Sequence, residues 1–184
     1  CFLPMDKIAN GIQTAARNLG ADDHALLMAA RGMLTTDTIH KLSGRTVTIA
    51  GREVQVTGMA KGAAMLAPNM ATMLAMLTTD AEADPATLRT VLTEAVDASF
   101  NVLTVDGCTS TNDTVILLAS GRAGQVDVAE LQKAVTAVCT NLAGQMAGDA
   151  EGATKVIRLE VVGAASDADA SVAARKIAQS QLVK

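Results

Sequence analysis

Hydrophobic residues recur with helical spacing near the start of the chain. From Asp6 to Leu19 they occupy one side of a helix, at Ile8, Ile12, Ala15, Ala16 and Leu19. The pattern ends at Gly20, and glycine is the commonest residue just beyond a helix C-terminus. We therefore predict an amphipathic helix that packs on one side, followed by a short second helix from Asp23 to Ala30.

Alternating polar and apolar positions predict strands further along. Residues Thr46–Ile49 and Glu53–Thr57 alternate around Ala50-Gly51, which is typical of a β-hairpin with a tight turn. The apolar run from Met70 to Leu77 fits a strand or a helix by its pattern alone. We interpret it as a buried strand that begins near Thr72.

Three more short segments have strand-like patterns. Val102–Val105 and Val115–Ala119 are apolar runs that we interpret as inner strands. Residues Lys155–Val162 alternate, with Val156, Arg158 and Glu160 on one face and Ile157, Leu159 and Val161 on the other. The alternation predicts another strand there.

Helix start signals are clear in the second half of the chain. Asp84 precedes Pro85, an N-cap residue before a proline at the first helical position, and a buried stripe follows at Leu88, Val91, Leu92, Ala95 and Val96. Asp127 with Glu130 resembles a capping box before the stripe of Leu131, Ala134, Val138 and Leu142. A last helix is expected from about Asp169 to Ser180.

The order of these elements favours one fold class. Paired strands followed by paired helices, without regular βαβ alternation, indicate an α+β fold in layers rather than a doubly wound sheet. A length of 184 residues suits one core domain with a sizeable hydrophobic interior. We expect residues 1–184 to form that single core domain.

Composition narrows the classes of ligand. The chain has two Phe and no Trp or Tyr, so aromatic stacking on nucleic-acid bases is not available. The net charge is −4 and no basic run occurs, which argues against nucleic acid or an anionic membrane as a partner. We expect small-molecule ligands, and no apolar run reaches the roughly 20 residues of a membrane span.

Metal and phosphate chemistry has little support in the sequence. The cysteines Cys1, Cys108 and Cys139 lie far apart and form no CxxC pair, which fits a reducing cytoplasm. His24 and His40 stand in no triad or metal-ligand spacing, so we expect no metal site. Gly121-Arg122-Ala123-Gly124 lacks both the Walker lysine and the dinucleotide fingerprint, so no bound cofactor is expected.

The most informative stretch is Pro68-Asn69-Met70-Ala71-Thr72-Met73-Leu74. A small residue before a threonine that opens an apolar run is the pattern of a self-cleaving N-terminal nucleophile. Cleavage of the Ala71–Thr72 bond would leave Thr72 with a free amine, whose ordinary pKa of about 8 lets it serve as the base for the threonine hydroxyl. Without further context, Thr72 is more simply interpreted as a β-branched residue that fills a strand.

A longer block identifies a family. The residues around Thr72 run from Lys61-Gly62-Ala63-Ala64-Met65-Leu66-Ala67 through Thr78-Thr79-Asp80-Ala81, and they resemble the bifunctional ornithine acetyltransferase / N-acetylglutamate synthase family of arginine biosynthesis. Further matches occur in the family's order, at Leu34-Thr35-Thr36-Asp37-Thr38, Ser99-Phe100-Asn101, Val105-Asp106-Gly107, Ser110-Thr111-Asn112-Asp113-Thr114 and Gly148-Asp149-Ala150-Glu151-Gly152-Ala153-Thr154-Lys155.

The resemblance implies a fold and a reaction. It implies a layered αββα sandwich of N-terminal-nucleophile type, cleaved between Ala71 and Thr72 into the end of an alpha chain, 1–71, and the start of a beta chain, 72–184. Thr72 would then accept acetyl from N-acetylornithine and pass it to glutamate. Acetyl-CoA is a possible additional acetyl donor that the sequence does not decide.

The resemblance also implies substrate-binding residues besides Thr72. Lys61 would hold a substrate carboxylate, although alone it reads as a solvated lysine. Thr38 would contact substrate, or else cap a turn. Glu151 would bind the substrate's α-ammonium group, with Asp149 as a competitor for that role. Asn112 and Asp113 are interpreted as residues that support the fold or orient the neighbourhood of Thr72.

Two rival functions and several wider expectations stay open. The rivals are an N-terminal-nucleophile amidohydrolase or aminopeptidase, and an uncleaved, inactive assembly module. By resemblance, Cys1 follows almost directly on the family's oxyanion pair and Lys184 stops before its C-terminal block, so we expect a piece of a longer protein. The cleaved chains should remain interlocked, in a cytoplasmic protein that forms a higher homo-oligomer.

Overall fold

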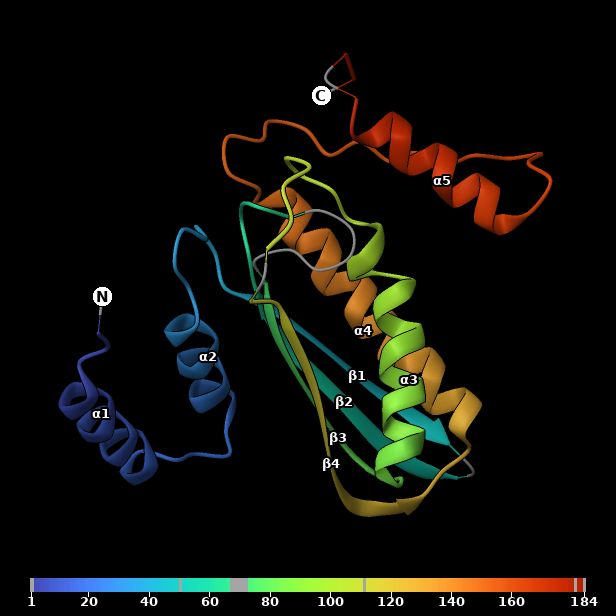
Figure 1. Cartoon of the computed structure of the whole chain (residues 1–184). Helices are drawn as coiled ribbons and strands as arrows, with labels where there is room; N and C mark the ends of the chain where they lie inside the picture. Colours follow the sequence, from blue (N-terminus) through green and yellow to red (C-terminus); the bar gives the residue numbers. More distant parts are fainter. Residues whose placement is uncertain (1, 50, 67–72, 111, 181, 184) are drawn as a thin grey trace.

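The computed structural model describes residues 2–49, 51–66, 73–110, 112–180 and 182–183 (Figure 1). Its helices and strands follow in the order α1 (Met5–Arg17), α2 (Asp23–Gly32), β1 (Lys41–Ile49), β2 (Arg52–Lys61), β3 (Leu74–Glu82), α3 (Pro85–Asp97), the 3₁₀ turn η1 (Phe100–Val102), β4 (Thr114–Gln125), α4 (Val128–Gly148) and α5 (Asp167–Ala178). The predicted mixture of helices and strands is confirmed.

The four strands form one mixed sheet in the order β1-β2-β3-β4. β1 and β2 pair as the predicted antiparallel hairpin, in which Ile49 faces Arg52, and β3 continues antiparallel to β2. β4 lies parallel to β3, because α3 returns the chain to the same end of the sheet. At that end, Lys61 is the register partner of Leu74, so the end of β2 lies beside the start of β3.

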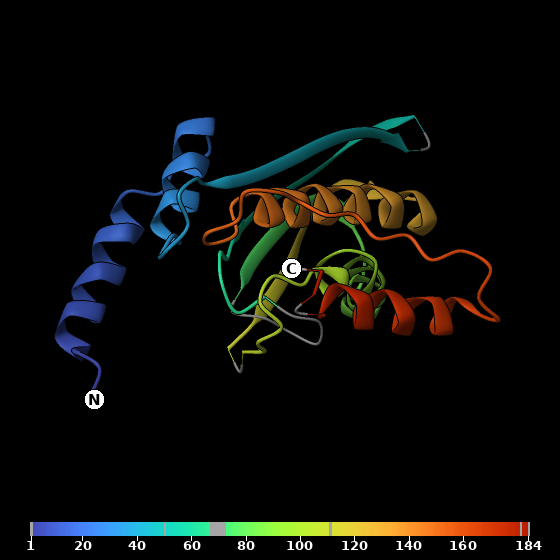
Figure 2. The same cartoon turned by 90° about the horizontal axis from the view of Figure 1, so that it is seen from above.

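Helices α3 and α4 lie side by side on one face of the sheet and enclose the core (Figure 2). The strand residues that face them alternate with exposed ones, as a sheet covered on one side requires. Both helices begin at the predicted caps, where Asp84 accepts hydrogen bonds from the N–H groups of Ala86 and Thr87, and Asp127 accepts one from that of Glu130. The described residues thus supply one α layer and one β layer.

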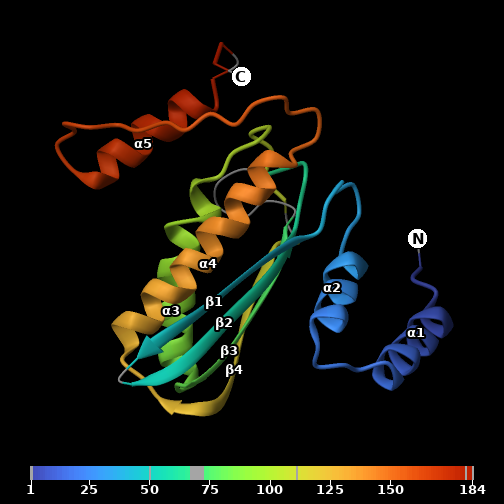
Figure 3. The same cartoon turned by 180° about the vertical axis from the view of Figure 1, so that it is seen from behind.

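The first and last helices, α1 and α5, form where the sequence predicts them, but α1 does not pack as predicted. α1 has no buried residue among those described, and Ile12 is 65% exposed. It ends at Arg17, with Asn18 rather than a glycine at the C-cap. Figure 3 shows α1 and α5 away from the sheet and its two covering helices. A helical stripe determines which face can be buried, but burial also requires a neighbouring element, so the prediction of one-sided packing was wrong.

Two predicted strands are not formed. Residues 102–105 begin in η1 and continue without pairing to a strand, because the Val105 N–H instead bonds to the Leu66 carbonyl oxygen at 2.6 Å. Residues 155–162 form neither a strand nor a helix, and Val156 and Ile157 are 61% and 59% exposed. A strand needs a neighbour for its N–H and C=O groups, which alternation alone cannot supply.

The remaining strand predictions hold with shifted bounds. β3 begins at Leu74 and continues to Glu82, whereas we expected a strand over residues 70–77 that begins near Thr72. Residues 67–72 lie outside the described part of the chain, so this start is not tested. β4 contains the predicted Val115–Ala119 segment and extends it to Gln125.

Gly58 allows β2 to approach α4 closely, which gives a stability prediction. A Cβ at Gly58 would lie 3.0 Å from Leu142 Cδ1 and 3.0 Å from Val138 Cγ1. We expect Gly58→Ala to lower the free energy of unfolding by about 1 to 3 kcal/mol through overpacking.

Gly144→Ala is the matched control for this substitution. No described atom outside the helix's own backbone lies within 4 Å of a Cβ at Gly144 in α4, so this change should stabilise by up to about 1 kcal/mol through helix propensity. Urea denaturation of both variants measures the difference. Equal midpoints would contradict the close packing of β2 on α4.

Candidate functional site

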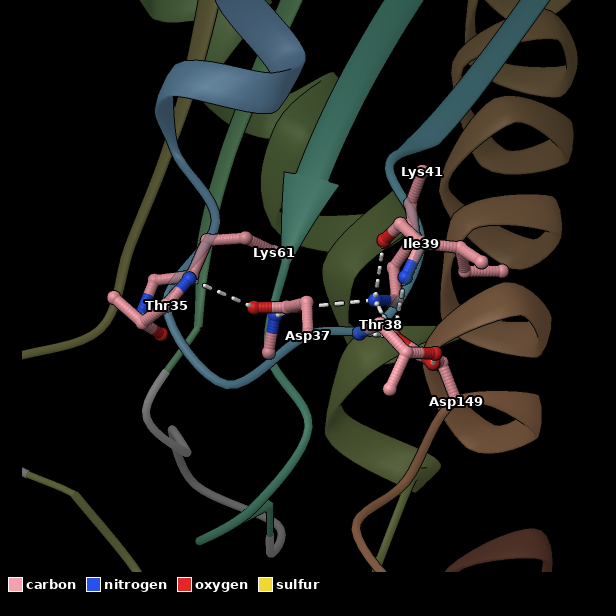
Figure 4. A network of polar contacts seen from close by, with 8 residues as sticks. Thr35, Asp37, Thr38, Ile39, Lys41, Lys61 and Asp149 are labelled. Atoms are coloured by element: carbon pink, nitrogen blue, oxygen red, sulfur yellow. Dashed lines mark hydrogen bonds and ion pairs between the residues drawn. The ribbon is translucent and has the colours of Figure 1, made fainter.

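A buried lysine links two carboxylates at one end of the sheet. Lys41, the first residue of β1, is completely buried, and its Nζ lies 2.7 Å from Asp37 Oδ1 and 2.6 Å from Asp149 Oδ2 (Figure 4). Asp37 comes from the loop after α2 and Asp149 from the C-terminal cap of α4. One ammonium group therefore joins two segments more than 100 residues apart.

Asp149 orders the loop that contains Thr38. Its carboxylate accepts hydrogen bonds from the Thr38 hydroxyl and from the N–H groups of Thr38 and Ile39, at 3.0 and 3.4 Å for the two N–H groups. Burial alone would raise the pKa of Asp149, but the hydrogen bond from Lys41 and those from Thr38 hold it below its ordinary value. The carboxylate therefore stays ionised and keeps all these donors.

Asp37 connects the same loop to the end of β2. Its Oδ1 accepts from the Gly62 N–H at 2.6 Å, in addition to Lys41. Burial opposes ionisation, but these hydrogen bonds and the positive charge of Lys41 lower the pKa of Asp37 below its usual range. Gly62 adopts a φ of 151°, a conformation that residues with a side chain rarely adopt.

Lys61 lies between this network and the start of β3. It is 8% exposed, and its Nζ lies 3.5 Å from Thr35 Oγ1, the hydroxyl of a residue in the loop after α2. Because its own ammonium forms no ion pair among the described residues, unlike that of Lys41, it can bind an anionic group. A substrate carboxylate is such a group.

Glu151 reaches the site through the chain after Asp149. Its N–H donates to the Ala63 carbonyl oxygen at 2.7 Å, which fixes residues 149–151 against the segment after β2. The Glu151 side chain is exposed. The backbone is therefore held while the carboxylate can turn toward a ligand.

The residue after Thr72 is held by the start of β4. The Met73 N–H donates to Asp113 Oδ1 at 2.7 Å, and the Met73 carbonyl oxygen accepts from the Thr114 N–H at 3.2 Å. Asp113 is buried, which raises its pKa to about 6, against the smaller opposing effects of the Met73 N–H and the charge of Lys61.

The structure brings together three of the four predicted substrate-binding residues. Thr38, Lys61 and Glu151 lie on segments joined by the hydrogen bonds of Asp37, Asp149 and Ala63. Thr72 and Ala71 lie outside the described residues, so their predicted roles are not tested. Nothing in the structure tests ligand binding by the other three either, and these assignments stay predictions.

The residues that hold this site together are not recognisable from the sequence patterns. Lys41 and Asp37 have no predicted role, and Asp149 is predicted only as a competitor of Glu151. Lys41 is the first residue of β1, and nothing in the sequence around it signals burial between two carboxylates. The spacing of Asp37 and Lys41, four residues apart, is a local signal for their pairing.

A possible metal site was sought among the side chains of the described residues. No group of three or more His, Cys, Asp or Glu side chains within them could hold a metal ion.

None of the helices in the described part of the chain has the length and apolarity to span a membrane.

The amino-acid sequence matches a protein-family model and many known proteins. A family model described as "ArgJ family" matches residues 2–184. The "Arginine biosynthesis bifunctional protein ArgJ" of Mycolicibacterium paratuberculosis is 48% identical over 188 residues, covering 99% of this chain and 45% of that protein. The mitochondrial protein of the same name from Schizosaccharomyces japonicus is 40% identical, covering 99% and 43%.

A solved structure agrees with these sequence matches. The crystal structure of arginine biosynthesis bifunctional protein argJ from Bacillus halodurans superposes with a TM-score of 0.55 at 45% identity, covering 58% of this chain and 53% of that one. The chain spans about half the length of the curated relatives it matches.

Proposed function

Because this chain belongs to the ArgJ family, we propose that the full-length protein that contains it transfers an acetyl group from N-acetylornithine to glutamate, after cleaving its own backbone between Ala71 and Thr72. The names of its relatives place them in arginine biosynthesis and call them bifunctional, which supports an acyltransferase with two substrates. The predicted division into residues 1–71 and 72–184 is part of this proposal.

The reaction is a double displacement. The Thr72 hydroxyl attacks the acetyl carbonyl of N-acetylornithine while the free amine of Thr72 takes the hydroxyl proton. The amide C–N bond breaks, ornithine leaves with that proton, and an acetyl ester remains on Thr72. The α-amine of glutamate then attacks the ester, which restores the threonine hydroxyl and yields N-acetylglutamate.

One observation carries the proposal: Lys61 is the register partner of Leu74, two residues after Thr72. The pairing places the backbone of Lys61 beside the start of the strand that follows Thr72, and the Lys61 ammonium forms no ion pair among the described residues. N-Acetylornithine and glutamate both carry an α-carboxylate, so Lys61 can bind either one in turn. Thr38 and Glu151, on the segments tied to Lys61, would bind the remaining polar groups of the amino acid.

Intact-mass spectrometry of the full-length protein tests the proposal. We expect two chains that separate between Ala71 and Thr72, and an added acetyl mass on the chain that begins with Thr72 after incubation with N-acetylornithine alone. Glutamate should then remove that mass and appear as N-acetylglutamate. The experiment needs no added metal or bound cofactor, and acetyl-CoA in place of N-acetylornithine would show whether it is also a donor.

The rival functions give different products in the same experiment. An amidohydrolase or aminopeptidase would lose the acyl group to water at the same rate with and without glutamate. An assembly module would show an uncut chain and no acetyl adduct. Either result would contradict the acetyl transfer, and the second would leave the family membership as evidence of fold alone.

A further inference from the structure

The segment from residue 105 to residue 114 holds the chain on both sides of the stretch that contains Thr72. On the earlier side, Asp106 Oδ2 accepts from the Met65 N–H at 2.5 Å, and the Val105 N–H donates to the Leu66 carbonyl oxygen at 2.6 Å. On the later side, Asp113 and Thr114 bond to Met73. Met65 has a φ of 53°, a conformation that is uncommon for residues other than glycine.

Both main-chain polar groups of Met73 are fixed by this segment. Asp113 Oδ1 accepts from the N–H at 2.7 Å, and the Thr114 N–H donates to the carbonyl oxygen at 3.2 Å. The first of these bonds acts directly on the peptide unit that joins Met73 to Thr72, because the Met73 N–H belongs to that unit and the Met73 carbonyl belongs to the next one. A carboxylate forms a stronger hydrogen bond to an N–H than a neutral acceptor does.

Asp113 is buried at a cost in free energy, which indicates that the residue has a specific role. It is 8% exposed, and its Oδ2 has no hydrogen-bond partner among the residues that the structure describes. It lines a cavity of about 20 Å³ whose wall is otherwise mostly apolar, with Leu66, Phe100, Val115 and Met146. Burial of an ionisable group among apolar neighbours costs free energy, and the bond to Met73 offsets only part of that cost.

We propose that Asp113 is a positioning residue for acetyl transfer, which orients Thr72 by holding the Met73 N–H with an ionised carboxylate. The proposal rests on the proposed function, since it needs Thr72 as nucleophile. Asp113 does not touch the reacting atoms in this assignment. It acts through one peptide plane, and misplacement of a nucleophile by about 1 Å is enough to slow a reaction roughly a hundredfold.

The charge of Asp113 gives the proposal a pH signature. Its pKa is raised to about 6 by burial, and Lys61 is the charged group that acts on it among the described residues. Above pH 6 the carboxylate is ionised and holds Met73 strongly. Below that pH it is neutral, so the wild-type residue then resembles an asparagine in charge and in acceptor strength.

The test uses the full-length protein and the rate at which the acetyl mass appears on the Thr72 chain. Asp113→Ala removes the acceptor, and we expect acetylation to slow about a hundredfold at pH 8 and by a smaller factor, about twentyfold, below pH 5, where the wild-type carboxyl group is neutral. Asp113→Asn keeps a neutral acceptor and should restore most of that rate. Its remaining deficit relative to the wild type, about fivefold at pH 8, should disappear below pH 5, because the wild-type group is then protonated too.

Asp127→Ala is the matched control. Asp127 also accepts from a backbone N–H, that of Glu130 at 3.0 Å, but at the start of α4 and on an exposed site. It should leave the acetylation rate at the wild-type value. A loss of rate in Asp113→Ala that merely reflected weaker folding would appear in Asp127→Ala as well, and circular dichroism checks the folding of all variants.

Two results would overturn the proposal. One is Asp113→Ala acetylating within threefold of the wild type, and the other is a deficit of Asp113→Asn that stays the same from pH 5 to pH 8.

Failure of the proposed function itself looks different, because the wild type would then form no acetyl adduct. In that case the rate of cleavage between Ala71 and Thr72 still reports the orientation of Thr72, and an unchanged cleavage rate in Asp113→Ala would also overturn the assignment.

Discussion

Lys41→Met is expected to lower the free energy of unfolding of the full-length protein by about 3 to 5 kcal/mol, because it leaves two buried carboxylates without their cation. The lysine Nζ lies 2.7 Å from Asp37 and 2.6 Å from Asp149, and its side chain is completely buried. Methionine has a similar length, so the change removes the charge with little change in packing. Guanidinium denaturation measures the difference.

The effect of Lys41→Met should depend on pH in a definite direction. In the wild type, the lowered pKa values of Asp37 and Asp149 mean that the network stabilises the fold above the ordinary carboxyl pKa of about 4 and loses this effect as the pH falls further. In the variant, desolvation is unopposed by the lysine charge, so both carboxyl pKa values rise. Protonation then removes the free-energy cost of burying two unpaired negative charges. The loss of stability caused by Lys41→Met should therefore be smaller at pH 4.5 than at pH 7.5.

Lys133→Met is the matched control for the buried pair. Lys133 lies 2.6 Å from Glu130, the same short distance, but the two side chains are 72% and 51% exposed. Water and salt screen such a pair, so its removal should leave the denaturation midpoint unchanged at both pH values. A Lys41→Met protein as stable as the Lys133→Met protein would show that the Asp37–Lys41–Asp149 network does not hold the site together.

Thr72→Ala is expected to abolish both cleavage after Ala71 and formation of the acetyl adduct. Alanine has no hydroxyl, so neither the internal acyl shift nor the attack on N-acetylornithine can occur, and the rate should fall by roughly 10⁴-fold or more. Thr72→Ser keeps a hydroxyl and should retain both reactions at reduced rates. Intact mass and product analysis of the full-length protein measure all three variants.

Thr78→Ala provides the control for this experiment. Thr78 lies on β3, the strand that follows Thr72. The residue is exposed, and its hydroxyl donates a long hydrogen bond of 3.5 Å to the Thr57 carbonyl oxygen. It should cleave and acetylate like the wild type. Persistent cleavage in Thr72→Ala would exclude Thr72 as the group that breaks the bond, and an acetyl adduct on that variant would place the nucleophile elsewhere.

Much of the fold could be predicted from local sequence signals. The caps at Asp84 and Asp127 determined the starts of α3 and α4, since a side-chain oxygen satisfies N–H groups within three residues. The hairpin of β1 and β2 followed from alternation around Gly51, which adopts a φ of 78°. In each case the partner that stabilises the element lies nearby in the chain.

Predictions that needed a distant partner were the ones that failed. Residues 155–162 alternate like a strand but pair with no strand in the described part of the chain, and the N–H of Val105 bonds to Leu66 instead of to a strand. The helical stripe of α1 correctly predicted a helix and wrongly predicted its burial. Periodicity describes what a segment can bury or pair, and the rest of the fold decides whether it does.

The candidate site divides in the same way. The sequence by itself determined the family, because a run of specific residues in a fixed order needs no structure to be recognised. Through that resemblance it also predicts Thr72 as the nucleophile and Thr38, Lys61 and Glu151 as substrate-binding residues. Only the tertiary structure showed that Lys41 lies between Asp37 and Asp149, and that Asp113 holds Met73. Of these contacts, the one with the longest sequence separation, between Lys41 and Asp149, joins residues 108 positions apart, and such contacts depend on distance and burial, which no local pattern encodes.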